Sequence, residues 1–295
     1  MRLRRLADSR MPTAQRNTRA GARRNIAAHY DLSNELFAAF LDETLTYSSA
    51  LFEAPGEPLE TAQRRKVEAA LDSADVRAGS HVLEIGTGWG QLALQAAARG
   101  AQVTTITLSR EQLELARERV AAAGVADRVE LRLEDYRDTT GRYDAVVSIE
   151  MIEAVGDEFW PVYFQAIDER LVPGGHACVQ AILMEHDRYL ATRGSFGWIR
   201  KHIFPGGMIP SLEAISTITA QRTRLGIESV RRFGDSYAET LRRWRTRFLE
   251  HRTDVARLGF DERFARMWEF YLAYCEAGFA ARYLDVAQIE FVKHP

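Results

Sequence analysis

The segment 81–90, HVLEIGTGWG, constrains the fold of this chain more than any other. The apolar residues of a short strand run directly into three glycines at every second position, Gly86, Gly88 and Gly90. A helical pattern follows from residue 91, so the segment predicts a strand, a tight turn and a helix. Because glycine has no Cβ, such a turn bends sharply and lets the backbone approach a ligand closely.

The polar residues near this turn indicate which ligand it takes. Glu84 precedes the glycines, and no lysine of a phosphate-binding loop follows them. A carboxylate suits a cationic ligand, and the sulfonium and amino groups of S-adenosylmethionine fit that description. A nicotinamide nucleotide site or a merely tight strand–helix turn would show the same glycines. However, the second predicted strand ends at Thr107 without the acid that holds a ribose in a dehydrogenase, and Gln112 is the next polar group in reach.

The composition is that of an ordinary globular protein, with 46% hydrophobic and 27% charged residues among 295. The net charge of −2 is unevenly distributed. Residues 1–24 hold eight arginines and one acid, a charge of +7, so about −9 remains on the rest. We expect residues 1–24 to form a basic arm that is disordered until it meets an anionic surface; a solvated terminus is the alternative.

The sequence shows no membrane span and no metal motif. No window approaches the roughly 18 to 20 apolar residues that a span requires, and the arm lacks the apolar stretch of a secretory signal. The two cysteines, Cys178 and Cys275, form no CxxC pair, and no histidine spacing suggests a ligand set. We therefore expect buried thiols in a reducing cytoplasm and no metal.

Strand-like and helix-like segments alternate from residue 81 onward, which predicts an α/β fold with a mostly parallel sheet. Strands are expected at 81–86, 101–108, 128–134, 143–150, 174–183, 227–233 and 286–293. Helices are expected at 90–99, 109–123, 157–171, 236–258 and 261–283. Seven strands, with the last usually antiparallel, match the Rossmann-like sheet of class I methyltransferases, whereas a dinucleotide dehydrogenase has six parallel strands. The expected units are the arm (1–24), a helical cover over cofactor and substrate (25–75) and a methyltransferase domain (76–295) with a substrate-binding insertion at about 184–226, before the sixth strand.

Several further motifs occur in a fixed order over residues 25–293. They are HYDLSN (29–34), TYSSA (46–50), the turn with Trp89, TLS with Gln112 (107–112), EMIE (150–153), IFPGG (203–207), YAETL with Trp244 (237–244) and YL with Cys275 and Phe279 (271–279). In these motifs the chain resembles the cyclopropane-fatty-acyl-phospholipid synthase family, which includes the mycolic acid cyclopropane synthases.

The resemblance implies contacts to S-adenosylmethionine and a reaction centre. The implied cofactor contacts are Tyr47, Ser48, Gly86, Gly88, Thr107 and Gln112, with Asp135 at the adenine. In the family a bicarbonate ion, thought to be the base, is held by a Glu, a Tyr, a Cys and a His. Glu153 and Tyr237 match two of these positions, whereas Ser49 replaces the Cys and Gln180 replaces the His. Ser and Gln still hydrogen-bond an oxyanion, but a neutral amide is a different electrostatic partner from an imidazole, so the basicity and orientation of the ion could change.

The resemblance also implies the reaction. It is transfer of a methyl(ene) group to the double bond of an unsaturated acyl chain on a phospholipid, which gives a cyclopropane or a methylene or methyl branch. The carbocation formed on the way needs a dry site with aromatic faces. Candidates are Tyr30, Phe37, Tyr47, Phe204, Tyr237 and Phe270. The aromatic residues at helical spacing in 264–283 are more simply interpreted as packed core.

The expected setting is the cytoplasm, on the inner face of the membrane, with an anionic membrane surface as partner and no nucleic acid. A reductase partner would complete a methylene product, and the sequence leaves the oligomeric state open, a homodimer included. Two alternatives remain: an amine N-methyltransferase of the same fold, and a non-catalytic lipid- or cofactor-binding protein. The glycine turn and Glu153 argue against the second.

Overall fold

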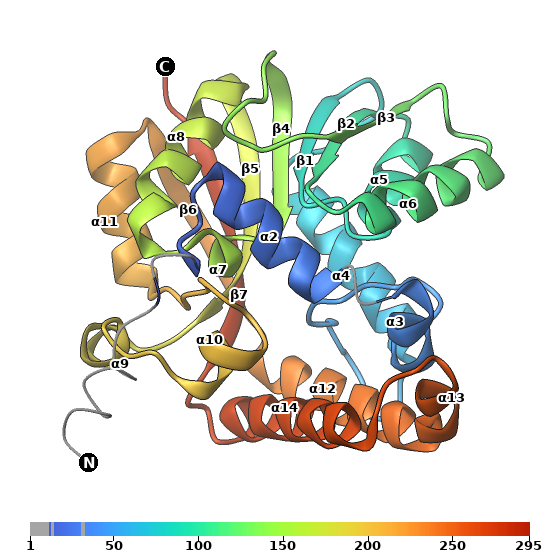
Figure 1. Ribbon diagram of the computed structural model, residues 1–295. Coiled ribbons are helices and arrows are strands. Elements are labelled where there is room, and N and C mark those ends of the chain that lie inside the picture. The colour runs from blue at the N-terminus through green and yellow to red at the C-terminus, as the bar shows by residue number, and fades with distance from the viewer. Residues whose placement is uncertain (1–11, 13–14, 31–32) are drawn as a thin grey trace.

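The computed structural model of the chain describes residues 12, 15–30 and 33–295. Its centre is a seven-stranded sheet in the order β3-β2-β1-β4-β5-β7-β6 (Figure 1). The strands are β1 (His81–Ile85), β2 (Gln102–Thr107), β3 (Val129–Leu133), β4 (Tyr143–Ile149), β5 (Leu171–Leu183), β6 (Leu225–Arg232) and β7 (Asp285–Lys293). β1 pairs in parallel with β2 and β4, and β7 runs antiparallel to both β5 and β6. The predicted fold class, with its antiparallel last strand, is confirmed.

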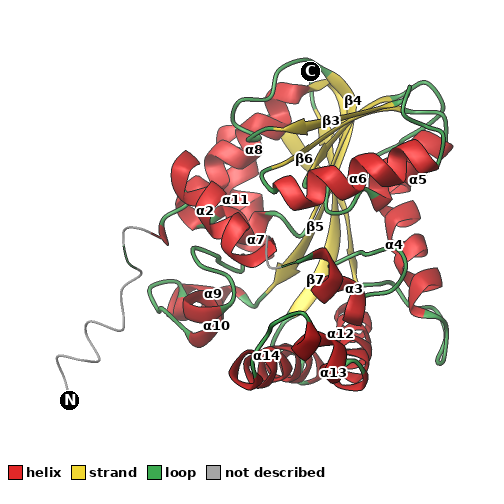
Figure 2. Ribbon diagram, turned by 45° about the vertical axis from the view of Figure 1, so that its right-hand side comes forward, coloured by secondary structure: helices red, strands yellow, loops and turns green. Residues whose placement is uncertain are grey.

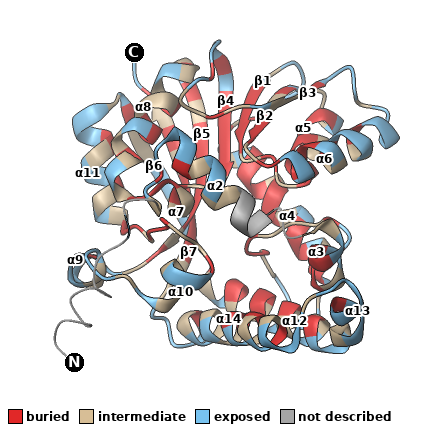
Figure 3. Ribbon diagram, viewed as in Figure 1, coloured by how far each residue is buried: buried red, intermediate tan, exposed pale blue. Residues whose placement is uncertain are grey.

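Helices cover both faces of this sheet, as the turned view in Figure 2 shows. The first face packs against α4 (Leu59–Ser73), α5 (Gln91–Ala98) and α6 (Arg110–Ala122), and the second against α8 (Trp160–Arg170) and α11 (Leu212–Arg222). Successive strand residues point to opposite faces, so Val82 belongs to the first core and Leu83 to the second. Figure 3 shows the buried strands between helices whose outer sides are exposed.

A third apolar cluster lies outside the sheet layers. It joins α3 (Asn34–Phe40), α12 (Gly234–Glu250), α13 (Arg252–Arg257) and α14 (Glu262–Ala280). Figure 1 shows α12 and α14 beneath the ends of the strands. The helix expected over 236–258 is divided because His251 leaves the helical conformation, with φ −99° and ψ 18°. Trp268, Tyr271 and Phe279 of α14 are buried core residues. This confirms the prediction that the aromatic residues of 264–283 belong to the packed core.

Short helices complete the fold. Residues 184–226 hold α9 (His186–Thr192), α10 (Trp198–His202) and α11, and α7 (Ile152–Val155) with the 3₁₀ turn η2 (Asp157–Phe159) follows β4. β5 begins at Leu171, three residues earlier than expected, and its register against β4 shifts between Tyr143 and Ala145. Among the described residues, no helix combines the length and apolar character needed to cross a membrane.

The expectation of a disordered arm fails for residues 15–24. α2 (Arg19–Tyr30) begins inside that range and crosses in front of the sheet (Figure 1). Asn17 is 4% exposed, and its side-chain amide donates to the carbonyls of Ala154 (2.8 Å) and Gly206 (3.0 Å). Arg16 and Arg19 form ion pairs with Glu158 and Asp138, so local polar contacts hold this segment on the body. Residues 1–11 and 13–14 of the arm lie outside the described residues.

Candidate active site

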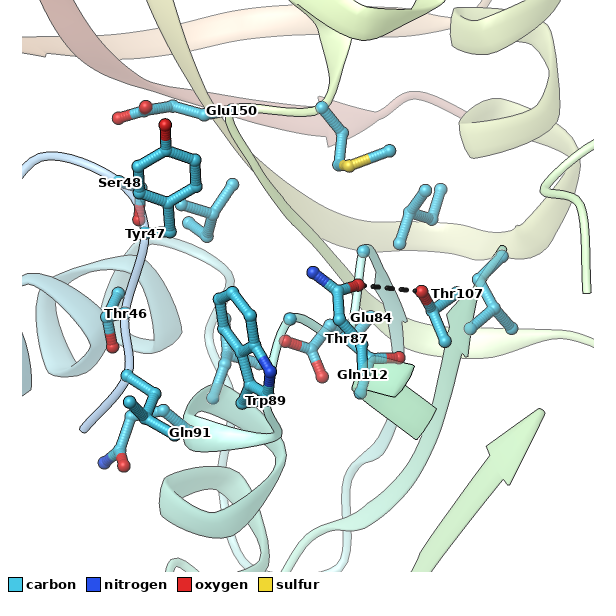
Figure 4. A pocket seen from close by; sticks show the side chains of 18 of the residues that line it. Thr46, Tyr47, Ser48, Glu84, Thr87, Trp89, Gln91, Thr107, Gln112 and Glu150 are labelled. Carbon is cyan, nitrogen blue, oxygen red and sulfur yellow. Dashed lines mark hydrogen bonds between the residues drawn. The ribbon is translucent and has the colours of Figure 1, made fainter. Parts of the chain in front are cut away.

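One pocket lies where β1, β2 and β4 end, and nearly all the expected cofactor contacts line it (Figure 4). Its lining includes Tyr47, Ser48, Glu84, Gly86, Gly88, Thr107 and Gln112. In Figure 4, Tyr47, Ser48 and Glu150 lie toward one end, and Glu84, Thr87 and Gln112 toward the other. The carboxyl ends of parallel strands are where α/β sheets bind ligands.

The glycine turn has the backbone geometry that its sequence predicts. Gly86, Gly88 and Gly90 have φ of +103°, +51° and +88°, which side chains disfavour. The N–H groups of Gly86 and Thr87 both donate to the Ile106 carbonyl, at 3.0 and 3.1 Å. A Cβ on Gly86 would lie 2.5 Å from Cγ of Met151. The turn therefore requires glycine at 86 and presents bare backbone to the pocket.

Thr107 and Gln112 are fixed by the start of α6. The Ser109 hydroxyl caps this helix by accepting from the Gln112 N–H at 3.2 Å, and the Ser109 N–H donates to the Thr107 hydroxyl. The Thr107 hydroxyl donates to Oε1 of Gln112 at 3.0 Å (Figure 4). Both side chains are thus oriented along the pocket wall.

Glu84 is buried, and its Oε2 has no hydrogen-bond partner among the residues that the structure describes. Burial raises the pKa of the Glu84 carboxyl to about 8, while a hydrogen bond with Thr105 and the charge of Lys66 oppose that shift. A buried carboxyl with an unused acceptor that lines a pocket suits a cationic ligand group. The amino or sulfonium group of S-adenosylmethionine is such a group, so the residues present fit this cofactor.

Lys66 lines the same pocket and was missed by the sequence analysis. It is fully buried, and its Nζ donates to the Ser48 hydroxyl at 2.6 Å. Burial lowers the pKa of the Lys66 ammonium to about 8, although the charges of Glu150, Asp42 and Glu84 act in the opposite direction. In sequence Lys66 follows two arginines on an amphipathic helix, a pattern that normally indicates an exposed face.

Asp135, the expected adenine contact, is not among the residues that line the pocket. Its carboxylate instead accepts two side-chain hydrogen bonds from Arg137, at 2.7 and 2.6 Å. Its neighbours Glu134 and Tyr136 line the pocket. Because successive residues after a strand point in different directions, the position of an acid in the sequence did not settle which side chain lines the pocket.

The residues expected to accompany Glu153 at the reaction centre form their hydrogen bonds with Glu150. Oε2 of Glu150 accepts from the Tyr237 hydroxyl at 2.6 Å. Its Oε1 accepts from Nε2 of Gln180 and from the backbone N–H of Ser49, both at 2.9 Å. The Ser49 hydroxyl is turned away and donates to the Ala50 carbonyl at 2.9 Å. Three of the four expected residues therefore meet, with Ser49 contributing its main chain.

Glu153 lies three residues further on, in the first turn of α7. Its Oε1 accepts from the backbone N–H of Ile182, and its buried Oε2 has no partner within the described part of the chain. Burial, and next the negative charge of Glu150, raise the pKa of the Glu153 carboxyl to about 8. At neutral pH Glu153 is thus mostly protonated. Burial likewise raises the pKa of the Glu150 carboxyl, whereas its hydrogen bonds and the charge of Lys66 lower that pKa.

An aromatic cluster joins α3, α12 and α14, and its member Tyr237 contacts Glu150. This aromatic cluster consists of Phe37, Phe40, Tyr47, Trp89, Phe204, Tyr237, Trp244, Phe248, Trp268, Tyr271 and Phe279. The Tyr237 ring packs 4.4 Å from that of Phe279, and the Tyr47 and Tyr271 hydroxyls are 2.7 Å apart. Phe270, expected to contribute a face, is 51% exposed and packs on Trp198 instead. For Tyr30, the structure describes the backbone but not the side chain.

The fold and the pocket define a class I, S-adenosylmethionine-dependent methyltransferase. The crystal structure of mycolic acid cyclopropane synthase CmaA1 complexed with SAH and CTAB matches with a TM-score of 0.86 and 27% identity, covering 97% of this chain and 100% of that one. The family model for mycolic acid cyclopropane synthetase matches residues 17–289, and the chain belongs to this family.

Two relatives with named activities are similar to this chain. Tuberculostearic acid methyltransferase UfaA1 of Mycobacterium tuberculosis is 57% identical over 289 residues, which cover 96% of this chain and 68% of that protein. Cyclopropane-fatty-acyl-phospholipid synthase of Escherichia coli is 34% identical over 264 residues, which cover 89% and 66%. The chain thus spans about two thirds of the length of these relatives.

Proposed function

We propose that the protein transfers a methyl group from S-adenosylmethionine to the double bond of an unsaturated fatty acyl chain on a phospholipid, and then removes a proton. The product is a methylene- or methyl-branched chain, or a cyclopropane. The observation that carries this proposal is a buried carboxylate, Glu150, that lines the same pocket as the glycine turn. The relative with 57% identity is named a methyltransferase, which favours the branched product.

Bound S-adenosylmethionine would supply a methyl group on a sulfonium. Glu84, Thr107, Gln112 and the glycine turn, which line one pocket, would hold it. An alkene is a weak nucleophile, so close positioning of the acyl chain contributes much of the acceleration. The face of Tyr47, which lines the pocket, stabilises the resulting carbocation by about 0.5–2 kcal/mol. The buried aromatic cluster excludes the water that would otherwise quench it.

An amine N-methyltransferase of this fold would need no group to take a proton from carbon. Coclaurine N-methyltransferase matches the structure at 17% identity with a TM-score of 0.74, which shows a shared fold alone. The buried pair of Glu150 and Glu153 favours the acyl substrate, because burying two carboxyls is costly and marks a site used for proton transfer.

Radiolabel from the methyl group of S-adenosylmethionine is expected to enter the acyl fraction of an oleoyl phospholipid. Saponification and thin-layer chromatography measure this, with the saturated stearoyl phospholipid as matched control, because it offers no π bond. Label in an added amine but not in the acyl chain would support the N-methyltransferase. No transfer to either acceptor would support a non-catalytic binding protein.

The lipid substrate suggests contact with a membrane, and we propose that the basic N-terminal segment supplies it on the cytoplasmic, inner face. Arg16 and Arg19 already pair with acids of the body, so the arginines at 2, 4, 5 and 10 are the ones assigned to lipid. A branched chain would arise from a methylene product through a reductase partner.

Replacing Arg2, Arg4, Arg5 and Arg10 by serine is expected to reduce binding to anionic vesicles at least tenfold at low salt, since each arginine near the surface contributes ~1 kcal/mol at best. Cosedimentation with phosphatidylglycerol vesicles measures the effect. Vesicles of phosphatidylcholine alone serve as control. Equal binding of variant and wild type to the anionic vesicles would contradict the assignment.

A further inference from the structure

The bicarbonate ion implied by the family resemblance does not fit this reaction centre. The donors that would hold it, the Tyr237 hydroxyl and Nε2 of Gln180, already donate to the Glu150 carboxylate at 2.6 and 2.9 Å. The Ser49 N–H makes a third such bond at 2.9 Å. A carboxylate and a bicarbonate share the planar arrangement of two oxygens on one carbon. The side chain of Glu150 therefore already satisfies an anion site.

We propose that Glu150 takes the place of the bicarbonate ion, and that its carboxylate is the base that removes the proton from the transferred methyl group. This inference rests on the proposed function and names the catalytic residue of its second step. Glu150 lines the cofactor pocket together with Tyr47, Ser48 and Gly86, so the proposed base and the cofactor would share one pocket.

The backbone at Glu150 supports a functional assignment. Glu150 has a φ of +52°, the left-handed conformation, which is strained for a residue other than glycine. Its N–H donates to the Gln180 carbonyl at 2.8 Å, which fixes this conformation at the end of β4. Such conformations cluster at active sites, where the surrounding structure enforces them. Here the left-handed turn aims the side chain at its three donors.

Electrostatics oppose a further anion in the same place. The titratable groups that face Glu150 are Tyr237, Glu153 and Lys66. Lys66 is a single positive charge, and it already faces Glu84 and Asp42 as well as Glu150. A bicarbonate beside Glu150 would add a like charge in a desolvated site, which is unfavourable.

The proposed step balances without another reactant. The carbocation formed by methyl transfer loses a proton from the new methyl carbon to one oxygen of Glu150. The electron pair of that C–H bond forms either the third bond of a cyclopropane or the exocyclic double bond of a methylene group, the latter after a hydride shift along the chain. Glu150 becomes a neutral carboxylic acid and returns its proton to solvent when the product leaves.

The first test compares the wild-type protein in carbonate-free buffer and in the same buffer with added bicarbonate. The rate of acyl methylation is expected to be equal in the two. A rate that rises severalfold with bicarbonate would overturn the proposal. If the wild-type protein labels no acyl chain under either condition, the proposed function itself fails, and the binding measurement below still tests the anion site.

The second test uses Glu150→Gly, which removes the carboxylate and adopts a φ of +52° without strain. The rate is expected to fall about 100-fold or more in carbonate-free buffer, in line with the contribution of a general base, and to recover about tenfold with bicarbonate. An undiminished rate would overturn the proposal. Carbon-13 NMR of labelled bicarbonate is expected to show binding to E150G and none to the wild type; binding to the wild type, or none to E150G, would overturn the assignment of the anion site.

Discussion

Glu150→Gln is expected to lower the rate of acyl methylation about a thousandfold, within the range for loss of a general base. The amide cannot accept a proton at neutral pH. Its NH₂ group would also replace one of the two oxygens, and would then face either the Tyr237 hydroxyl or the N–H groups of Ser49 and Gln180, all of which now donate to the carboxylate. Because Glu150 makes no contact proposed to hold the cofactor, the Kd for S-adenosylmethionine should change less than about threefold. Steady-state assays and calorimetric titration measure the two quantities.

The matched control is Glu153→Gln, three residues away in the same buried pair. Because the pKa of Glu153 is raised to about 8, this carboxyl is mostly neutral at pH 7, and glutamine resembles its protonated form. Glutamine also keeps an oxygen to accept the Ile182 N–H. The rate should fall about tenfold or less. If E153Q instead loses a thousandfold and E150Q a little, Glu150 is not the base, and Glu153 is the essential carboxyl of the reaction centre, as the resemblance implied.

Gly86→Ala is expected to weaken S-adenosylmethionine binding at least ~100-fold and to destabilise the fold by about 2 kcal/mol. At a φ of +103° any Cβ is strained, and this one would lie 2.5 Å from Cγ and 2.8 Å from Sδ of Met151. The methyl group would also displace the Met151 side chain, which lines the same pocket. Calorimetric titration measures the affinity, and thermal unfolding should show a Tm lower by roughly 3 °C.

Gly79→Ala is the control that distinguishes the effect of backbone strain on stability from the effect of a lost ligand contact on affinity. Gly79 has a φ of +86°, a Cβ there would meet nothing within 4 Å, and it precedes β1, away from the pocket lining. Its substitution should lower the Tm while the Kd for S-adenosylmethionine stays unchanged. Equal losses of affinity in the two variants would show that the effect at Gly86 is general destabilisation rather than loss of a ligand contact.

The elements of the sheet and most of the cofactor pocket could be predicted from sequence, because their signals are local. The strand, glycine turn and helix at 81–98 follow from residue pattern alone, and Ser109 and Gln112 form the expected cap. The pocket residues from the segment before α4, Tyr47 and Ser48, came from family resemblance rather than pattern.

The features of the site that the sequence analysis did not predict depend on the direction in which single side chains point. Glu150 and Glu153 occur in one motif at the end of β4, and sequence favoured the second. The structure gives Glu150 the left-handed conformation that turns it toward Tyr237, while α7 places Glu153 against the Ile182 N–H. Lys66 was missed because its burial depends on carboxylates from three distant segments. No periodicity encodes either arrangement.

In the N-terminal segment, too, contacts that form only in the folded protein could not be predicted from the sequence. Charge and composition alone predicted disorder through residue 24, but Asn17 inserts its amide between two backbone carbonyls that come together only in the folded protein. The charges of Arg16 and Arg19 are used locally for the same reason. A run of like charge therefore overstated how much of the arm is free to meet a membrane.

The central claim is that methyl transfer to an acyl double bond is followed by loss of a proton from the same carbon. The most direct test is mass spectrometry of the phospholipid acyl chains after reaction with S-adenosylmethionine whose methyl group carries three deuterium atoms. The account predicts an added carbon that retains two of the three, whether the product is a cyclopropane, a methylene or a methyl branch. Retention of all three, or a trideuterated amine with unaltered acyl chains, would contradict it.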